Sequence, residues 1–221
     1  MTPMTQIPEL LRSRIATDYQ PVRPLPSPFA RTLWLLPLSL LTLFAASLVF
    51  SSRSDAEALG GVGLWGASAF QVVVGLALAA AAMREAVPGQ GWSRVAIALW
   101  LGLPLAFLIF VTLASWEMSP VLLRRNWSII GLACFAGSLA SGLPLVALAS
   151  VLAARAYATR PVIAGALSGL GAGLIADAGW RLFWHFSEPA HVLSAHVGAV
   201  LISTMAGAML ASAICRAQRR S

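Results

Sequence analysis

Residues 95–114 read VAIALWLGLPLAFLIFVTLA, twenty residues without a charged side chain. An α-helix needs about 20 mostly apolar residues to cross a bilayer core that is about 30 Å thick, so this stretch has the length and the composition of a membrane span. Five other stretches meet the same condition. In chain order, the six predicted spans are 32–50, 62–83, 95–114, 127–152, 161–184 and 192–215. The sequence therefore predicts an all-α, polytopic membrane bundle of six transmembrane helices over residues 32–215.

The composition of the 221 residues agrees with a membrane protein, because 58% are hydrophobic and only 10% are charged. Such a chain cannot present an ordinary soluble surface, so its apolar faces must contact lipid or one another. The formal net charge of +7 raises the alternative of nucleic-acid binding. The arginines are scattered at helix ends rather than clustered with aromatic residues, and membrane topology explains that distribution. We expect the lipid bilayer as a partner and no direct contact with nucleic acid.

The arginines alternate between two sets of connecting segments. Eleven lie in the two tails and in the loops after spans 2 and 4, at Arg12, Arg14, Arg23, Arg31, Arg84, Arg94, Arg155, Arg160, Arg216, Arg219 and Arg220. The other set holds four, which are Arg53, Arg124, Arg125 and Arg181. Because positive residues stay on the cytoplasmic side of the membrane, this asymmetry predicts that both termini are cytoplasmic. Residues 216–221 then form a short basic tail inside the cell.

The amino-terminal tail, residues 1–31, is the one sizeable soluble segment. Its apolar residues recur at helical spacing, at Ile7, Leu10, Leu11, Ile15 and Tyr19. This pattern predicts a short amphipathic helix, which the prolines from Pro21 onward terminate. A helix of about 13 residues is marginal by itself in water. We therefore expect it either to lie on the membrane surface or to fold into a groove on a partner.

Polar residues collect at the outer ends of spans 5 and 6. Asp177 and Arg181 are four positions apart, which brings their side chains together on a helix, so we expect a salt bridge inside the membrane. Four more polar residues follow at His185, Glu188, His191 and His196. The histidines either face periplasmic water or form a sensory site for a metal ion or a proton. Their spacing matches no established metal motif, so the sequence leaves a metal site open.

Span 5 carries glycines at four-residue intervals, at Gly165, Gly169 and Gly173. Small residues at this spacing form a flat face on which another helix packs closely. The partner helix belongs either to the same chain or to a second copy in a homodimer. In span 2, Gln71 is a lone polar residue that we expect to bond a neighbouring helix.

Motifs of catalysis are missing from the sequence. It has no HExxH, no Gly-x-Ser-x-Gly, no glycine loop that would cradle a phosphate, and no clear Ser/His/Asp set. We therefore expect no catalytic residues, no cofactor and no enzyme activity.

Two parts of the chain resemble a known family. The run IATDYQPVRPL at residues 15–25 leads through Pro28 and Arg31 directly into the first predicted span. The second match consists of LPL at 143–145, Arg155, Pro161 and AGALSGLGAG at 164–173. Both resemble the NrsF-like family of six-span membrane anti-sigma factors. The resemblance implies a bacterial inner-membrane protein whose cytoplasmic tail holds an extracytoplasmic-function sigma factor inactive until a signal arrives. The tail residues expected to bind that partner are Leu11, Ile15, Asp18, Tyr19, Pro21, Val22 and Arg23.

The chain departs from the family pattern at one cysteine. Cys134 matches a cysteine of span 4, but the position after His185, where the family has a second cysteine, is Phe186. Cys215 cannot replace that thiol, because Cys134 lies about 10 Å below the outer surface and Cys215 lies at the inner end of span 6. A disulfide needs Cα atoms within about 7 Å. We therefore predict that each cysteine is a small apolar packing residue.

If the bundle senses a signal, the expected sensing residues are Cys134, Asp177, Arg181, His185, His191 and His196. The alternatives to an anti-sigma factor are a small transporter or channel-like subunit, whose pathway Asp177 and Gln71 would line, and an accessory subunit of a membrane complex. Only the anti-sigma factor requires a soluble sigma factor bound to residues 1–31.

Overall fold

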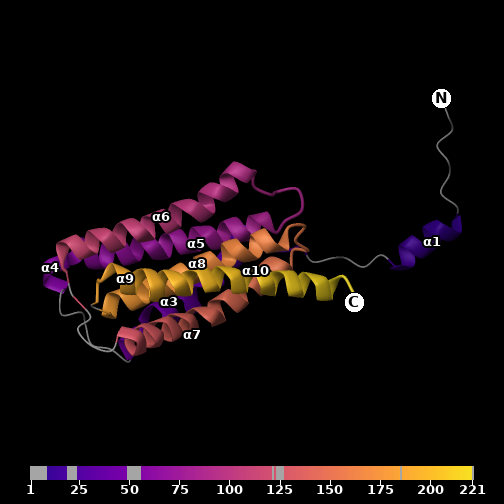
Figure 1. The fold of residues 1–221 in the computed structure, drawn as a ribbon. Helices are drawn as coiled ribbons and strands as arrows, with labels where there is room; N and C mark the ends of the chain where they lie inside the picture. The colour runs from indigo at the N-terminus through magenta and orange to yellow at the C-terminus, as the bar shows by residue number, and fades with distance from the viewer. Residues whose placement is uncertain are drawn as a thin grey trace.

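The computed structural model describes residues 9–18, 24–48, 56–120, 122, 127–184 and 186–220, and all regular secondary structure in these ranges is helical (Figure 1). The elements are α1 Glu9–Asp18, α2 Pro28–Leu33, α3 Leu36–Ala45, η1 Ala46–Leu48, α4 Ala56–Gly61, η2 Val62–Gly66, α5 Ala67–Glu85, α6 Arg94–Met118, α7 Trp127–Ala154, α8 Pro161–Phe183, α9 Pro189–His191, η3 Val192–Val197 and α10 Gly198–Gln218. Here η1 is a 3₁₀ turn, whereas η2 and η3 are π-helical turns.

Within the described residues, five helical runs are long and apolar enough to cross a membrane. These are Ala56–Glu85, Arg94–Met118, Ser128–Ala154, Pro161–Phe183 and Pro189–Gln218. They confirm predicted spans 2 to 6 as helices, with ends that differ by a few residues from the prediction. The first predicted span is represented by a shorter apolar segment, Pro28–Phe44. The chain is thus an all-helical, multi-pass membrane protein.

The shorter segment is broken into two helices by a proline. Pro37 has no N–H group, so it cannot donate the helical hydrogen bond to the carbonyl of Leu33. α2 therefore ends at Leu33, a turn follows at Trp34 and Leu35, and α3 starts at Leu36. Residues 49–55, which include the end of the predicted first span, lie outside the described residues.

Helix α8 lies in the centre of the bundle and packs against α3, α5, α7 and α10 (Figure 1). Glycines allow this close packing. A Cβ atom on Gly169 would overlap the backbone carbonyl of Ser203 in α10, and one on Gly171 would lie 2.5 Å from the carbonyl oxygen of Gly75 in α5. Gly165, Gly169 and Gly173 all face α10 of the same chain. The expectation of a homodimer seam through these glycines is therefore wrong, because their face is already covered.

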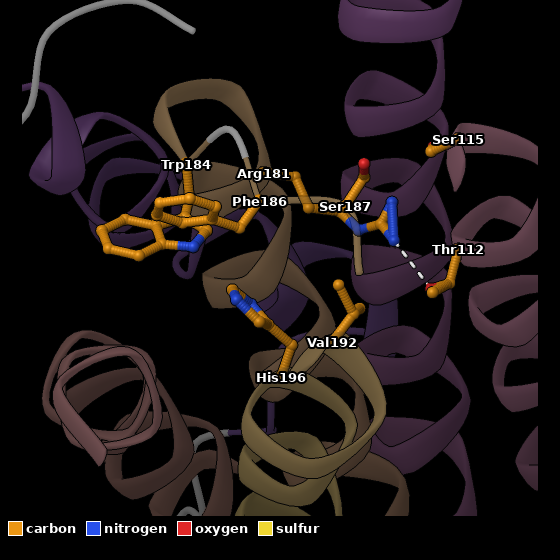
Figure 2. Close-up of a pocket in the computed structure, with 8 residues that line it drawn as sticks. All are labelled: Thr112, Ser115, Arg181, Trp184, Phe186, Ser187, Val192 and His196. Carbon is orange, nitrogen blue, oxygen red and sulfur yellow. Dashed lines mark hydrogen bonds between the residues drawn. The ribbon is translucent and has the colours of Figure 1, made fainter. Parts of the chain in front are cut away.

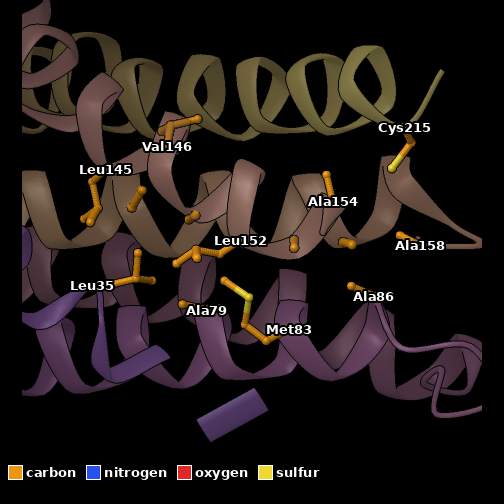
Figure 3. Packing of buried hydrophobic residues seen from close by; sticks show 14 of the residues in the cluster. Leu35, Ala79, Met83, Ala86, Leu145, Val146, Leu152, Ala154, Ala158 and Cys215 are labelled. Atoms are coloured by element: carbon orange, nitrogen blue, oxygen red, sulfur yellow. The ribbon is translucent and has the colours of Figure 1, made fainter. Parts of the chain in front are cut away.

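One half of the bundle is filled by a hydrophobic cluster that α3, α5, α7 and α10 share (Figure 3). Leu35, Met83 and Leu145 are each at most 1% exposed, and Cys215 is 4% exposed among them. The predicted packing role of Cys215 is confirmed. We call the end of the bundle that holds the loops 86–93 and 155–160 the inner end, and the opposite end the outer end.

Three arginine-bearing segments meet at the inner end. Arg160 pairs with the buried carboxylate of Glu85 at 2.7 Å, and the other carboxylate oxygen accepts the backbone N–H of Trp92 at 2.6 Å. Arg31 is only 1% exposed. The described loops with the most arginine thus lie side by side, as a common membrane face requires.

Candidate functional site

Asp177 is the centre of a buried polar cluster near the outer end of α8. It is 1% exposed, and three side chains donate to it. Its Oδ2 contacts Nε of Arg181 at 3.3 Å and Nε2 of Gln71 at 2.7 Å, whereas Oδ1 contacts Nδ1 of His196 at 2.9 Å. The predicted Asp177–Arg181 salt bridge is confirmed, and so is the prediction that Gln71 bonds a neighbouring helix. A buried carboxylate with this many donors is a stable anion, because each donor replaces part of its lost hydration.

Arg181 connects this cluster to α6. Its Nη2 donates to Oγ1 of Thr112 at 2.9 Å, and Figure 2 shows the guanidinium pointing toward Thr112 while Trp184 and Phe186 lie together away from it. Around these residues lies a cavity of about 20 Å³, which His196 also lines. A volume of this size holds about one water molecule. The arrangement can therefore bind a small polar species but not an organic ligand.

Aromatic rings cover the cluster. The ring of Phe186, which stands where the family pattern has its second cysteine, lies 5.3 Å from the ring of Trp184. Trp184 in turn stacks on the imidazole of His191, with 6.2 Å between centroids and 27° between planes. Phe186 therefore contributes an apolar cover in place of a thiol.

A π-helical turn brings two histidines onto one face. His191 is the N-cap residue of η3, and His196 lies inside it. Residues five apart point about 140° from each other on an α-helix with 3.6 residues per turn, but the i→i+5 bonding of a π-helix places them one above the other. Their ring centroids are accordingly 5.4 Å apart. Single π turns of this kind occur frequently at functional sites.

Cys134 of α7 completes this group. One ligand atom each from Cys134, His191 and His196 lies within 4.8 Å of the others, and all three residues are buried. The sequence analysis expected Cys134 only to pack, and it looked for carboxylates beside the histidines. Neither expectation could find this group, because Cys134 lies 57 positions before His191 and belongs to no spacing motif. Cys134 and Cys215 lie at opposite ends of the bundle and are both free, as the depth argument predicted.

Two other expectations about this region need correction or remain open. His191 is 0% and His196 is 3% exposed, so the view that they face periplasmic water is wrong for both. Gln71 and Asp177 bond each other at 1% exposure, which gives no support to a transport pathway lined by them. His185 lies outside the described residues.

The tail forms the predicted helix in part. α1 covers Glu9–Asp18, and Leu11 is 51% exposed on it. The side chain of Ile15 lies outside the described set, as do the expected partner-binding residues Tyr19, Pro21, Val22 and Arg23. The helix is thus confirmed, whereas its role in partner binding stays a prediction.

Sequence reasoning missed a contact at the inner end. Arg31 entered the analysis only as a topological charge, yet its Nη1 donates to the carbonyl of Leu152 at 3.1 Å and its Nη2 to the carbonyl of Met83 at 2.8 Å. Both acceptors lie in the last turns of α7 and α5, where carbonyls lack helical partners and a cation is favourable. The place of Arg31, immediately before a span, was the only signal in the sequence.

Comparison with known proteins gives one match. A family model described as NrsF, negative regulator of sigma F, matches residues 15–216. No curated protein and no solved structure matches the chain. The matched range contains the central helix, the polar cluster and nearly every other residue described above.

Proposed function

Because the chain belongs to the NrsF family of negative regulators of sigma F, we propose that it is a membrane anti-sigma factor. It holds an extracytoplasmic-function sigma factor at the bacterial inner membrane and releases it when a signal reaches the bundle. The match over residues 15–216 is the observation that carries this proposal. The family consists of regulators rather than enzymes.

In this proposal the chain crosses the membrane six times, with Pro28–Leu48 as the first crossing. Its helical residues number about 20, which suffices for a bilayer core of about 30 Å. The arginine-bearing loops at the inner end then face the cytoplasm. This orientation places the tail in the same compartment as a soluble sigma factor.

The tail supplies the binding segment. α1 has only ten residues, which is too short for a stable helix alone in water. A sigma factor that offers an apolar groove would stabilise it by covering Leu11, now 51% exposed, and its neighbour one turn later, Ile15. The exposed Arg12 and Arg14 would accelerate the encounter with an acidic surface more than they would hold the complex.

Arg31 provides a physical connection between the tail and the bundle. The guanidinium is buried and bonded to carbonyls of α5 and α7, so the position where the tail leaves the bundle depends on how these two helices sit. A signal that shifts α7 relative to α5 would disturb both hydrogen bonds. The tail would then change its position or its order, and with it the affinity for the sigma factor.

Co-purification tests the proposal. The full-length protein, solubilised in detergent, should capture a sigma factor co-expressed from the same bacterium. Leu11→Asp with Ile15→Asp should abolish capture, because burying two carboxylates in an apolar groove costs more than such a short interface can supply.

The matched control carries the same added charge on another face of α1. Ser13→Asp with Thr17→Asp keeps the four-residue spacing, and both positions are exposed. This variant should still capture the sigma factor. Equal capture by both double variants would contradict binding through the apolar face, and no capture by the wild-type protein would contradict the anti-sigma function itself.

A further inference from the structure

We propose that Cys134, His191 and His196 form a binding site for a thiophilic transition-metal ion, and that Cu(I) fits it best. The ligands come from α7, α9 and η3, so the ion would join segments that are far apart in the chain. The three residues lie together near the outer end, beside the Asp177 cluster.

The positions of the ligand atoms support coordination. They lie within 4.8 Å of one another, whereas a thiolate and two imidazoles that share an ion, with bonds of about 2.0–2.3 Å, lie about 3.3–3.8 Å apart. Small rotations of side chains close this difference. The π turn is what makes the pair of imidazoles available on one side, as their centroid separation of 5.4 Å shows.

His191 is the second observation that points to a ligand. It is 0% exposed, and among the described residues neither Nδ1 nor Nε2 has a hydrogen-bond partner. A buried polar group without a partner costs about 1–3 kcal/mol, so a protein that keeps an imidazole here gains from something that binds it. A metal ion bound to one nitrogen removes that cost.

Asp177 orients the other imidazole. Its Oδ1 holds Nδ1 of His196 at 2.9 Å, which requires the proton on Nδ1 and leaves the lone pair of Nε2 free for a metal. Metal-binding histidines commonly have a carboxylate partner of this kind, which fixes the tautomer and raises the basicity of the ligand nitrogen. Asp177 would act on the ion through His196, as a positioning residue.

Charge selects among thiophilic ions. Sulfur and imidazole donors suit both copper and zinc. Asp177 and Arg181 already neutralise each other, so the Cys134 thiolate would leave a neutral site with Cu(I) and a site of charge +1 with Zn(II). Uncompensated charge is costly in a buried position inside a membrane. The monovalent ion is therefore the better fit.

Metal binding could reach the tail through α7. The same helix carries Cys134 near the outer end and Leu152, whose carbonyl accepts from Arg31, about 27 Å further along at 1.5 Å per residue. An ion that draws Cys134 toward η3 would move α7 and disturb the Arg31 contact. This step rests on the proposed anti-sigma function, whereas the metal site itself does not.

The test measures Cu(I) binding to the full-length protein, reduced and free of oxygen in detergent, against a chromogenic Cu(I) chelator. The wild-type protein should bind one equivalent. Cys134→Ser and His191→Phe should each lose it, and Asp177→Asn should weaken binding about 10- to 100-fold through the orientation of His196. Cys215→Ser, which removes the other buried thiol, should bind like the wild type. A size-exclusion profile like that of the wild type identifies folded variants.

Two results would overturn the site: no stoichiometric Cu(I) binding by the folded wild-type protein, or equal affinity in Cys134→Ser and Cys215→Ser. Zn(II) competing equally with Cu(I) would overturn the charge argument. Capture of the sigma factor, measured without metal, separates this test from that of the function. A protein that captures the sigma factor but binds no Cu(I) contradicts only the metal site.

Discussion

Helices α6 and α8 are both long and apolar, yet they occupy opposite environments. In the apolar segment of α8, 83% of the residues are buried inside the chain, against 17% in α6. The more buried helix is nevertheless the less hydrophobic one, and it carries the glycines and the Asp177–Arg181 pair. In a membrane the lipid selects large apolar side chains, whereas helix contacts select small and polar ones. Hydropathy in this chain therefore reports contact with lipid rather than burial in the protein.

This comparison predicts the largest loss of stability for a charge removed from α8. Asp177→Leu leaves Arg181, His196 and Gln71 without their shared acceptor. We expect a loss of about 3–5 kcal/mol in the free energy of unfolding, because a broken buried pair leaves an uncompensated charge. Denaturant unfolding in detergent measures it. The double variant Asp177→Leu with Arg181→Leu should lose less, and equal stability of the single and double variants would contradict a buried pair.

A cavity in α8 should have the next largest effect. Leu170 is 1% exposed in the cluster between α5, α6 and α8, so Leu170→Ala should cost about 2–5 kcal/mol. The matched change on α6 is Leu103→Ala, where the side chain is 62% exposed. That variant should stay within about 0.5 kcal/mol of the wild type. Similar losses in both helices would show that α6 is packed against protein.

An added methyl group gives the smallest of the three effects. Gly169→Ala places Cβ against the backbone of α10 and should cost about 1–3 kcal/mol through overpacking. Gly102→Ala in α6 meets no atom within 4 Å, and it should be neutral or stabilising by about 0.5–1 kcal/mol, because alanine is the better helix former. A stable Gly169→Ala variant would contradict the close contact of α8 with α10.

Span length and charge distribution were readable from the sequence because each depends on neighbouring residues. Five of the spans follow directly from apolar runs, and the Asp177–Arg181 pair follows from the helical repeat. The break before α3 was less evident, since it required weighing Pro37 against an otherwise continuous apolar run. The packing of α8 inside the chain also had to come from the structure, because a glycine pattern does not say which helix it meets.

The group of Cys134, His191 and His196 could not be predicted in the same way. It depends on the approach of α7 to η3, which is a tertiary contact, and on a π turn, which no local pattern announces. The burial of Arg31 is a similar case, since its acceptors are carbonyls of two distant helices. Sites of this kind become visible only once the helices are packed.

The central claim is that this chain restrains a sigma factor through its tail. The direct test is a sigma-dependent transcription reporter in bacteria that make either the wild-type chain or the Leu11→Asp, Ile15→Asp variant, with membrane levels of the protein matched. We predict a silent reporter with the wild type and an active one with the variant, because the spans are unchanged and only the partner-binding face is lost. A reporter that stays silent with the variant, or that stays active with the wild type in unstressed cells, would contradict the account.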